Sequence, residues 1–80
     1  MDLEEPSPER LDLRGVACPL NWARAKARLE TMPRGARLLL IADDPRAARD
    51  IPGAAEAEGW AVLSVQATDD DRAVEIEIER

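Results

Sequence analysis

The sequence lacks histidine, tyrosine and phenylalanine, and it has a single cysteine among its 80 residues. One cysteine cannot close a disulfide within the chain, so a small secreted scaffold held together by disulfides is excluded. Without histidine, the chain cannot form a Ser-His-Asp or Cys-His catalytic arrangement, nor a zinc site of nitrogen and sulfur ligands. The chemistry available to the chain is therefore narrow.

Positive charge and aromatic rings are also scarce. The chain has 17 acidic and 11 basic residues, a net charge of −6, and two tryptophans are its only aromatic residues. Direct nucleic-acid binding is not expected, because it uses basic patches and stacking rings. The longest apolar run, residues 38–42, is far shorter than the ~20 residues of a membrane span. The acidic residues 1–10 do not resemble a signal peptide, so we expect a cytoplasmic protein whose thiol stays reduced.

Eighty residues provide enough chain for one hydrophobic core and no more. Residues 1–9 contain two prolines and four acids, a composition typical of a disordered leader. The sequence therefore predicts one domain, residues 10–80.

Apolar spacing in that domain predicts the element order β-α-β-α-β-β. Two helices are expected to cover one face of a four-stranded sheet, which is an α+β two-layer sandwich. Strands are predicted at residues 10–14, 37–42, 60–67 and 72–80, and the first helix at 19–32.

Several details of these elements are predicted as well. Trp22, Ala25, Leu29 and Met32 form the apolar stripe of the first helix. In the third strand, Ala61, Leu63, Val65 and Ala67 share one face, and the glutamates of the last strand face water.

The second helix is expected in two parts. Asp44 is predicted as its N-cap, with Pro45 at the first helical position. The first turn should be irregular before Pro52, with a firmer helix over residues 52–58.

Cys18 is the one obvious nucleophile. It follows the break at Gly15 and directly precedes Pro19, so it is expected at the start of the first helix. Unpaired N–H groups and the positive end of the helix dipole favour a thiolate or a persulfide there, and Arg14 adds positive charge. A small buried hydrophobic residue is the other interpretation of Cys18, because it also continues the stripe of Trp22.

The sequence around Cys18 resembles that of a known family. Residues 11–19, Leu-Asp-Leu-Arg-Gly-Val-Ala-Cys-Pro, are similar to the N-terminal signature of TusA/SirA sulfur carriers, in which a Cys-Pro-x-Pro motif begins a helix. Residues 38–45 and 49–53 are similar to the family's second strand, acidic turn and second helix. The resemblance covers residues 10–79 and implies a mixed sheet whose first two strands are parallel, as in the C-terminal domain of initiation factor three.

The resemblance also implies a function. The motif cysteine of this family accepts sulfane sulfur from a cysteine desulfurase and passes it to another protein thiol, for tRNA thiolation, molybdenum-cofactor synthesis or sulfur metabolism. By this resemblance, Cys18 carries the sulfur, Pro19 fixes the start of the helix, and Asp43 and Asp44 form the acidic turn. No metal or organic cofactor is expected, and we expect a monomer that meets a sulfur donor and an acceptor protein in turn.

One position departs from the motif: Asn21 stands where the second proline is expected. Its side chain is predicted to reach back to a backbone group near Cys18 and so keep the turn rigid. The alternative is a non-catalytic interaction or regulatory module of the same fold that has lost sulfur transfer. A thiol redox sensor is a third possibility, which would need a partner thiol because the chain has no second cysteine.

The first helix carries three cations near the reactive end, Arg24, Lys26 and Arg28. They are candidates for docking a partner protein, and a solvated helix face explains them equally well.

Overall fold

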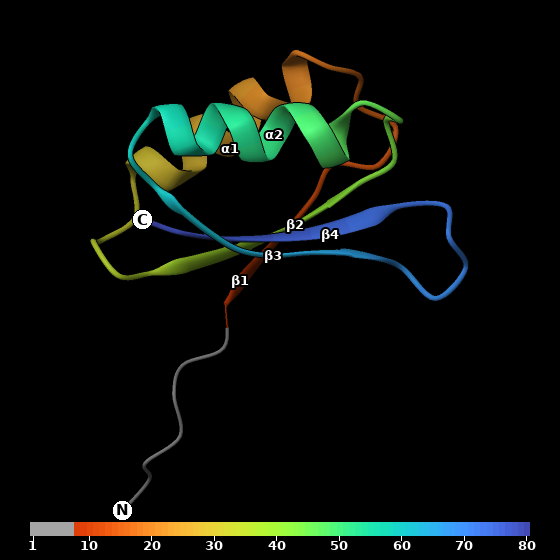
Figure 1. Cartoon of the computed structure of the whole chain (residues 1–80). Coiled ribbons are helices and arrows are strands. Elements are labelled where there is room, and N and C mark those ends of the chain that lie inside the picture. The colour runs from red at the N-terminus through yellow and green to blue at the C-terminus, as the bar shows by residue number, and fades with distance from the viewer. Residues whose placement is uncertain (1–7) are drawn as a thin grey trace, which may run out of the picture.

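Two helices lie on one face of a four-stranded sheet (Figure 1). The structure, a computed structural model, describes residues 8–80, so most of the predicted leader lies outside the described residues. The predicted element order and fold class are confirmed. The elements are β1 (Glu9–Asp12), α1 (Leu20–Glu30), β2 (Arg37–Ala42), α2 (Ala47–Ala57), β3 (Ala61–Ala67) and β4 (Val74–Glu79).

The sheet is mixed, with the strand order β1-β2-β4-β3. β1 is parallel to β2, and β4 is antiparallel to both β2 and β3. Because parallel strands end at the same edge of a sheet, the connections that follow β1 and β2 leave the sheet side by side. These two connections carry Cys18 and the acidic turn.

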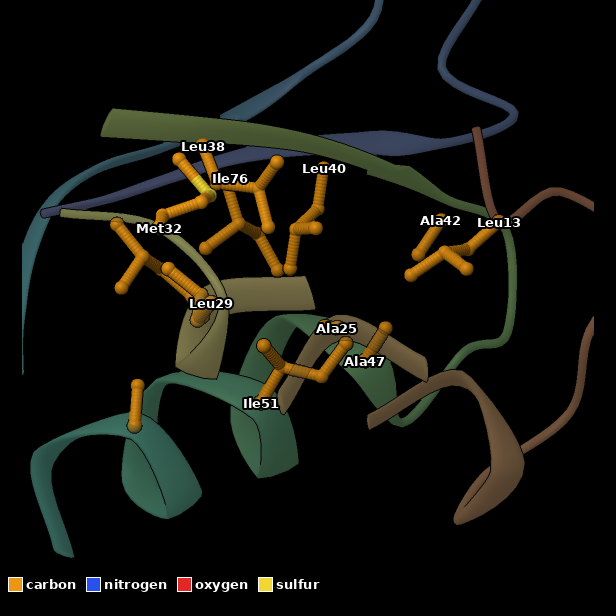
Figure 2. Packing of buried hydrophobic residues seen from close by; sticks show 12 residues of the cluster. Leu13, Ala25, Leu29, Met32, Leu38, Leu40, Ala42, Ala47, Ile51 and Ile76 are labelled. Atoms are coloured by element: carbon orange, nitrogen blue, oxygen red, sulfur yellow. The ribbon is translucent and has the colours of Figure 1, made fainter. Parts of the chain in front are cut away.

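The core lies between the sheet and the helices (Figure 2). Leu38 and Leu40 of β2 point from the sheet toward the helices, where Leu29 and Ile51 pack against them. Leu13 extends the core toward the connection that carries Cys18; its N–H donates to the carbonyl oxygen of Ile41 at 2.7 Å. The platform beneath both connections is therefore apolar and closely packed.

The stripe of α1 differs from the prediction by one residue. Asn21, rather than Trp22, is fully buried together with Ala25 and Leu29. Trp22 is half-buried at the edge of the core, where its ring lies 6.1 Å from that of Trp60. The two tryptophan rings therefore pack together at the rim of the core, while Asn21, Ala25 and Leu29 are buried beneath the helix.

The prediction for the second helix was wrong at its start. α2 is continuous through Pro52, and its N-cap is Arg46 rather than Asp44. Pro52 removes one helical N–H, and the carbonyl left without that donor belongs to the exposed Ala48. Burial of Ala47, Ile51 and Ala55 against the sheet offsets this cost, since all three are fully buried.

The prediction that four residues of β3 share one face was also wrong, because Ala61 lies opposite Glu79 and Val65 lies opposite Ile76, two β4 residues that face opposite sides of the sheet. Leu63 and Val65 are exposed, at 46% and 42%, and Val62 packs against the core instead. An irregularity in the pairing with β4 falls between Val62 and Ser64. An extra residue at such a point shifts the alternation, so a period-2 pattern read along the sequence assigns the wrong face.

The other boundaries differ from the prediction by one or two residues. β1 begins at Glu9, inside the predicted leader, and ends at Asp12, while α1 ends at Glu30. In β4 the isoleucines are buried and the glutamates are half-buried on the opposite face, where Glu77 pairs with Arg37 at 3.2 Å. No helix among residues 8–80 has the length and apolar content to cross a membrane.

Candidate functional site

The connection from β1 to α1, residues 13–19, turns sharply after the strand. The turn closes when the Val16 N–H donates to the Leu13 carbonyl oxygen at 3.1 Å. Gly15 has a φ of +83°, a backbone conformation that is unfavourable for residues with a Cβ atom. The chain thus reverses direction between the end of β1 and Cys18.

Two aspartates from the neighbouring connection bind this turn. Asp43 Oδ1 accepts the Gly15 N–H at 2.9 Å, and Asp44 Oδ2 accepts the Cys18 N–H at 3.1 Å. Both aspartates directly follow β2, which is parallel to β1. The acidic turn is therefore the support on which the cysteine connection rests.

Cys18 lies directly before the N-cap residue of α1, Pro19, and the Cys18–Pro19 peptide bond is cis. Its side chain is half-buried and lies outside the apolar core, so the interpretation as a buried hydrophobic residue is not supported. The first turn of α1 contains no acidic residue and no side-chain cap. The positive end of the helix dipole is thus not neutralised by a carboxylate of the helix itself.

The carboxylate that binds Cys18 also binds an arginine. Asp44 accepts hydrogen bonds from the backbone N–H of Arg46 at 2.8 Å and from its guanidinium at 3.3 Å. These bonds, with a smaller contribution from the Cys18 N–H, lower the pKa of Asp44 from 3.8 to about 2. Asp44 is therefore ionised throughout the neutral range.

Comparison with known proteins identifies the family. The sequence model of the family described as Sulfurtransferase TusA matches residues 9–80. This chain belongs to the TusA family. Its match to a "putative sulfur carrier protein" of Archaeoglobus fulgidus is 45% identical over 58 residues, which is 72% of this chain and 66% of the relative.

The fold is that of the family as well. A SirA-like protein from Desulfitobacterium hafniense superposes with a TM-score of 0.75, covering 88% of this chain and 93% of that protein, at 24% identity. At this identity the likeness concerns the fold alone. The match with the Archaeoglobus relative spans slightly less than two thirds of that protein's length.

In this TusA-family chain, the Arg14 side chain is engaged by Asp12, the last residue of β1. Its guanidinium donates to both oxygens of Asp12, at 3.0 and 2.7 Å, and lowers the pKa of that carboxyl from 3.8 to about 2. The other charges that act on Arg14 are those of Asp43 and Asp70. Arg14 stabilises the turn before Cys18, and its charge is balanced by a neighbouring carboxylate.

Asn21, at the position where the family motif has its second proline, does not reach back toward Cys18. It is fully buried, and its Oδ1 accepts the N–H of the next residue, Trp22, at 2.6 Å. Its Nδ2 has no hydrogen-bond partner among the described residues. The predicted contact to the cysteine turn is therefore replaced by a local contact within α1.

Two of the three cations on α1 have structural partners. Lys26 pairs with Glu58 after α2, at 3.2 Å, and Arg28 pairs with Glu9 of β1 through both carboxylate oxygens. Arg24 is exposed, and no partner for it is found among residues 8–80. The three residues thus do not form a single patch of free positive charge.

The residue that the sequence analysis missed is Arg46. Its position two residues after Asp44 was a usable signal, because an aspartate commonly accepts the backbone N–H of that position. No three carboxylate or thiol groups in the described part of the chain are grouped closely enough to bind a metal ion. The site therefore consists of one thiol, backbone N–H groups, two carboxylates and one guanidinium.

Proposed function

We propose that this chain is a sulfur carrier that bears sulfane sulfur as a persulfide on Cys18. The observation that carries the proposal is the position of the chain's one cysteine, half-buried and directly before the N-cap residue of α1, in a TusA-family fold. A carrier needs a thiol that a partner can reach and whose position is fixed. The hydrogen bond from the Cys18 N–H to Asp44 meets the second need, and partial exposure meets the first.

The loading step is an exchange between sulfur atoms. The Cys18 thiolate attacks the terminal sulfur of a persulfide on the donor, such as a cysteine desulfurase. A new S–S bond forms at Cys18, the S–S bond of the donor breaks, and the donor cysteine leaves as a thiolate. If Cys18 begins as a thiol, its proton passes to water.

The unloading step reverses these roles. An acceptor thiolate attacks the terminal sulfur on Cys18, and Cys18 leaves as a thiolate, so no net oxidation or reduction occurs. The chain acts stoichiometrically and returns to its starting state. Acceptor proteins in tRNA thiolation, molybdenum-cofactor synthesis or sulfur metabolism are the proposed destinations, in the cytoplasm, where thiols remain reduced.

Contacts with the donor and the acceptor should be small and short-lived, because a carrier must release each partner. Both partners need access to the same sulfur, so they bind in turn rather than together. Arg24, Lys26 and Arg28 remain the proposed docking residues on α1, with Arg24 exposed for this role.

Intact-protein mass spectrometry tests the proposal. The chain is incubated with a cysteine desulfurase and cysteine, and we expect one added sulfur that a reductant removes. Cys18→Ala should abolish the adduct, and Arg37→Ala, at the far end of β2, serves as a control that should retain it. If an established carrier is charged under the same conditions and this chain is not, the non-catalytic module of the same fold becomes the better explanation.

A further inference from the structure

Arg46 and Cys18 are joined through a single oxygen atom. Asp44 Oδ2 accepts the Cys18 N–H at 3.1 Å and an Arg46 guanidinium N–H from Nη2 at 3.3 Å. The other oxygen, Oδ1, accepts the backbone N–H of Arg46 at 2.8 Å and its Nε–H at 3.3 Å. The Arg46 guanidinium thus donates through both Nε and Nη2 to the same carboxylate that accepts the Cys18 N–H.

The two members of this ion pair differ in exposure. The Asp44 side chain is 8% exposed and the Arg46 side chain is 56% exposed. The carboxylate lies beneath the surface, and the guanidinium reaches solvent beside the cysteine connection. Of the two charged groups in this ion pair, the cation is therefore the more accessible from solvent.

The other charged side chains of the two connections already have bonding partners. Asp43 is bonded to Gly15, and Arg14 is bonded to Asp12. The first turn of α1 has no acid. The pKa of Arg46 is raised chiefly by its bonds to Asp44, with a smaller contribution from the charge of Cys18.

We propose that Arg46 is a positioning residue for the sulfur on Cys18, and that it favours the anionic states of that sulfur during loading and unloading. The part of this inference that concerns the persulfide rests on the proposed function. The sulfur is negative as the attacking thiolate, as the terminal atom of the persulfide and as the leaving thiolate. A cation beside it stabilises each state and reduces the repulsion when a second anionic sulfur approaches.

A pair of alkylating reagents tests the charge effect without any partner protein. Iodoacetate is anionic and iodoacetamide is neutral, so the ratio of their rates with Cys18 measures the local potential. Removing one cation at a side-chain distance in water should lower this ratio by about threefold in Arg46→Ala. Arg46→Lys keeps the charge and should retain most of the ratio, whereas a purely structural role would not be rescued in this way.

Arg37→Ala is the matched control. Arg37 is also paired with a carboxylate, that of Glu77, but it begins β2 while Asp44 follows the end of that strand. A strand of this length separates them by about 20 Å, more than the Debye length of about 8–10 Å in physiological salt. We expect the ratio of the iodoacetate rate to the iodoacetamide rate in Arg37→Ala to equal that of the parent chain. In about 1 M salt, the ratio of the parent chain should fall close to that of Arg46→Ala.

The outcomes separate this inference from the proposed function. An equal ratio in Arg46→Ala and Arg37→Ala, both folded by circular dichroism, overturns the role of Arg46 even if the parent chain accepts sulfur. A lowered ratio in Arg46→Ala, when the parent chain never accepts sulfur, retains the role of Arg46 toward the thiolate and rejects the carrier. When Arg46→Ala lowers the ratio and the parent chain accepts sulfur, single-turnover loading should be several-fold slower in Arg46→Ala and partly restored in Arg46→Lys.

Discussion

The connections that follow β1 and β2 occupy equivalent positions in the sheet and differ in composition. Each leaves a parallel strand and leads into a helix that packs on the same face. The first, residues 13–19, carries the thiol and turns at Gly15 with a φ of +83°. The second, residues 43–46, carries two aspartates and needs no residue of positive φ.

The hydrogen bonds between the two connections run in one direction. N–H groups of Gly15 and Cys18 in the first connection donate to Asp43 and Asp44 in the second. The cysteine connection is therefore fixed in place by carboxylates that belong to its neighbour. In the first connection itself, the Arg14 side chain adds a bond to Asp12 of β1.

The largest expected effect concerns the platform that both connections share. Leu40 is fully buried in β2, so Leu40→Ala should lower the free energy of unfolding by about 2–5 kcal/mol. Urea denaturation measures this loss. Amide exchange should rise together at Gly15 and Cys18, and a rise at only one of them would show that the connections do not rest on a common core.

Glycine substitutions test the difference in backbone conformation between Gly15, with its positive φ, and a glycine within a helix. Gly15→Ala should lower the free energy of unfolding by about 1–2 kcal/mol, because the left-handed conformation is unfavourable for alanine. Gly53→Ala, in an exposed part of α2 with open space around it, should be neutral or raise stability by up to about 1 kcal/mol. Thermal melts of both variants compare them directly, and equal effects would contradict the special backbone of the first connection.

Removing each aspartate tests the direction of the hydrogen bonds. Asp43→Ala should increase amide hydrogen exchange at Gly15, and Asp44→Ala should increase it at Cys18, each by roughly fivefold to tenfold. Nuclear magnetic resonance resolves the two amides. Each substitution should leave the amide bound by the other aspartate nearly unchanged, and crossed effects would mean that the acidic turn moves as one unit.

Acid should weaken both connections. The pKa values of Asp12 and Asp44 are lowered from 3.8 to about 2 in the folded chain. Because the folded state favours their ionised forms, their contribution to stability is present above about pH 4 and is lost as the pH falls toward 2. Urea midpoints between pH 5 and 2 measure the loss, which should be smaller in Asp12→Asn and Asp44→Asn; an equal loss in both variants and the parent would contradict it.

The fold could be predicted from the sequence further than the site could. The alternation in β4, the apolar run of β2 and the stops around α1 were sufficient for the element order, because each is a local pattern. The predictions failed where tertiary packing overrode such a pattern. Burial of Ile51 kept α2 helical through Pro52, and an irregular register with β4 placed Ala61 and Val65 on opposite faces of β3.

For the site, the resemblance assigned Cys18 and the acidic turn, but sequence did not show how they are related. Asn21 illustrates the limit: its type and spacing suggested a contact with the cysteine turn, and the rotation of α1 instead buries it toward the core. Arg46 was overlooked because its relation to Cys18 depends on an aspartate from another connection.

By itself, the amino-acid sequence determined three features: a single thiol before a proline at the start of a helix, the lack of histidine for catalysis or metal binding, and the alternation of apolar and polar residues that builds the sheet. These follow from residue types and local spacing. Only the tertiary structure decided which groups surround that thiol. The parallel pairing of β1 with β2 brings Asp44, and with it Arg46, to Cys18 across 26 residues of sequence, a proximity that no local pattern encodes.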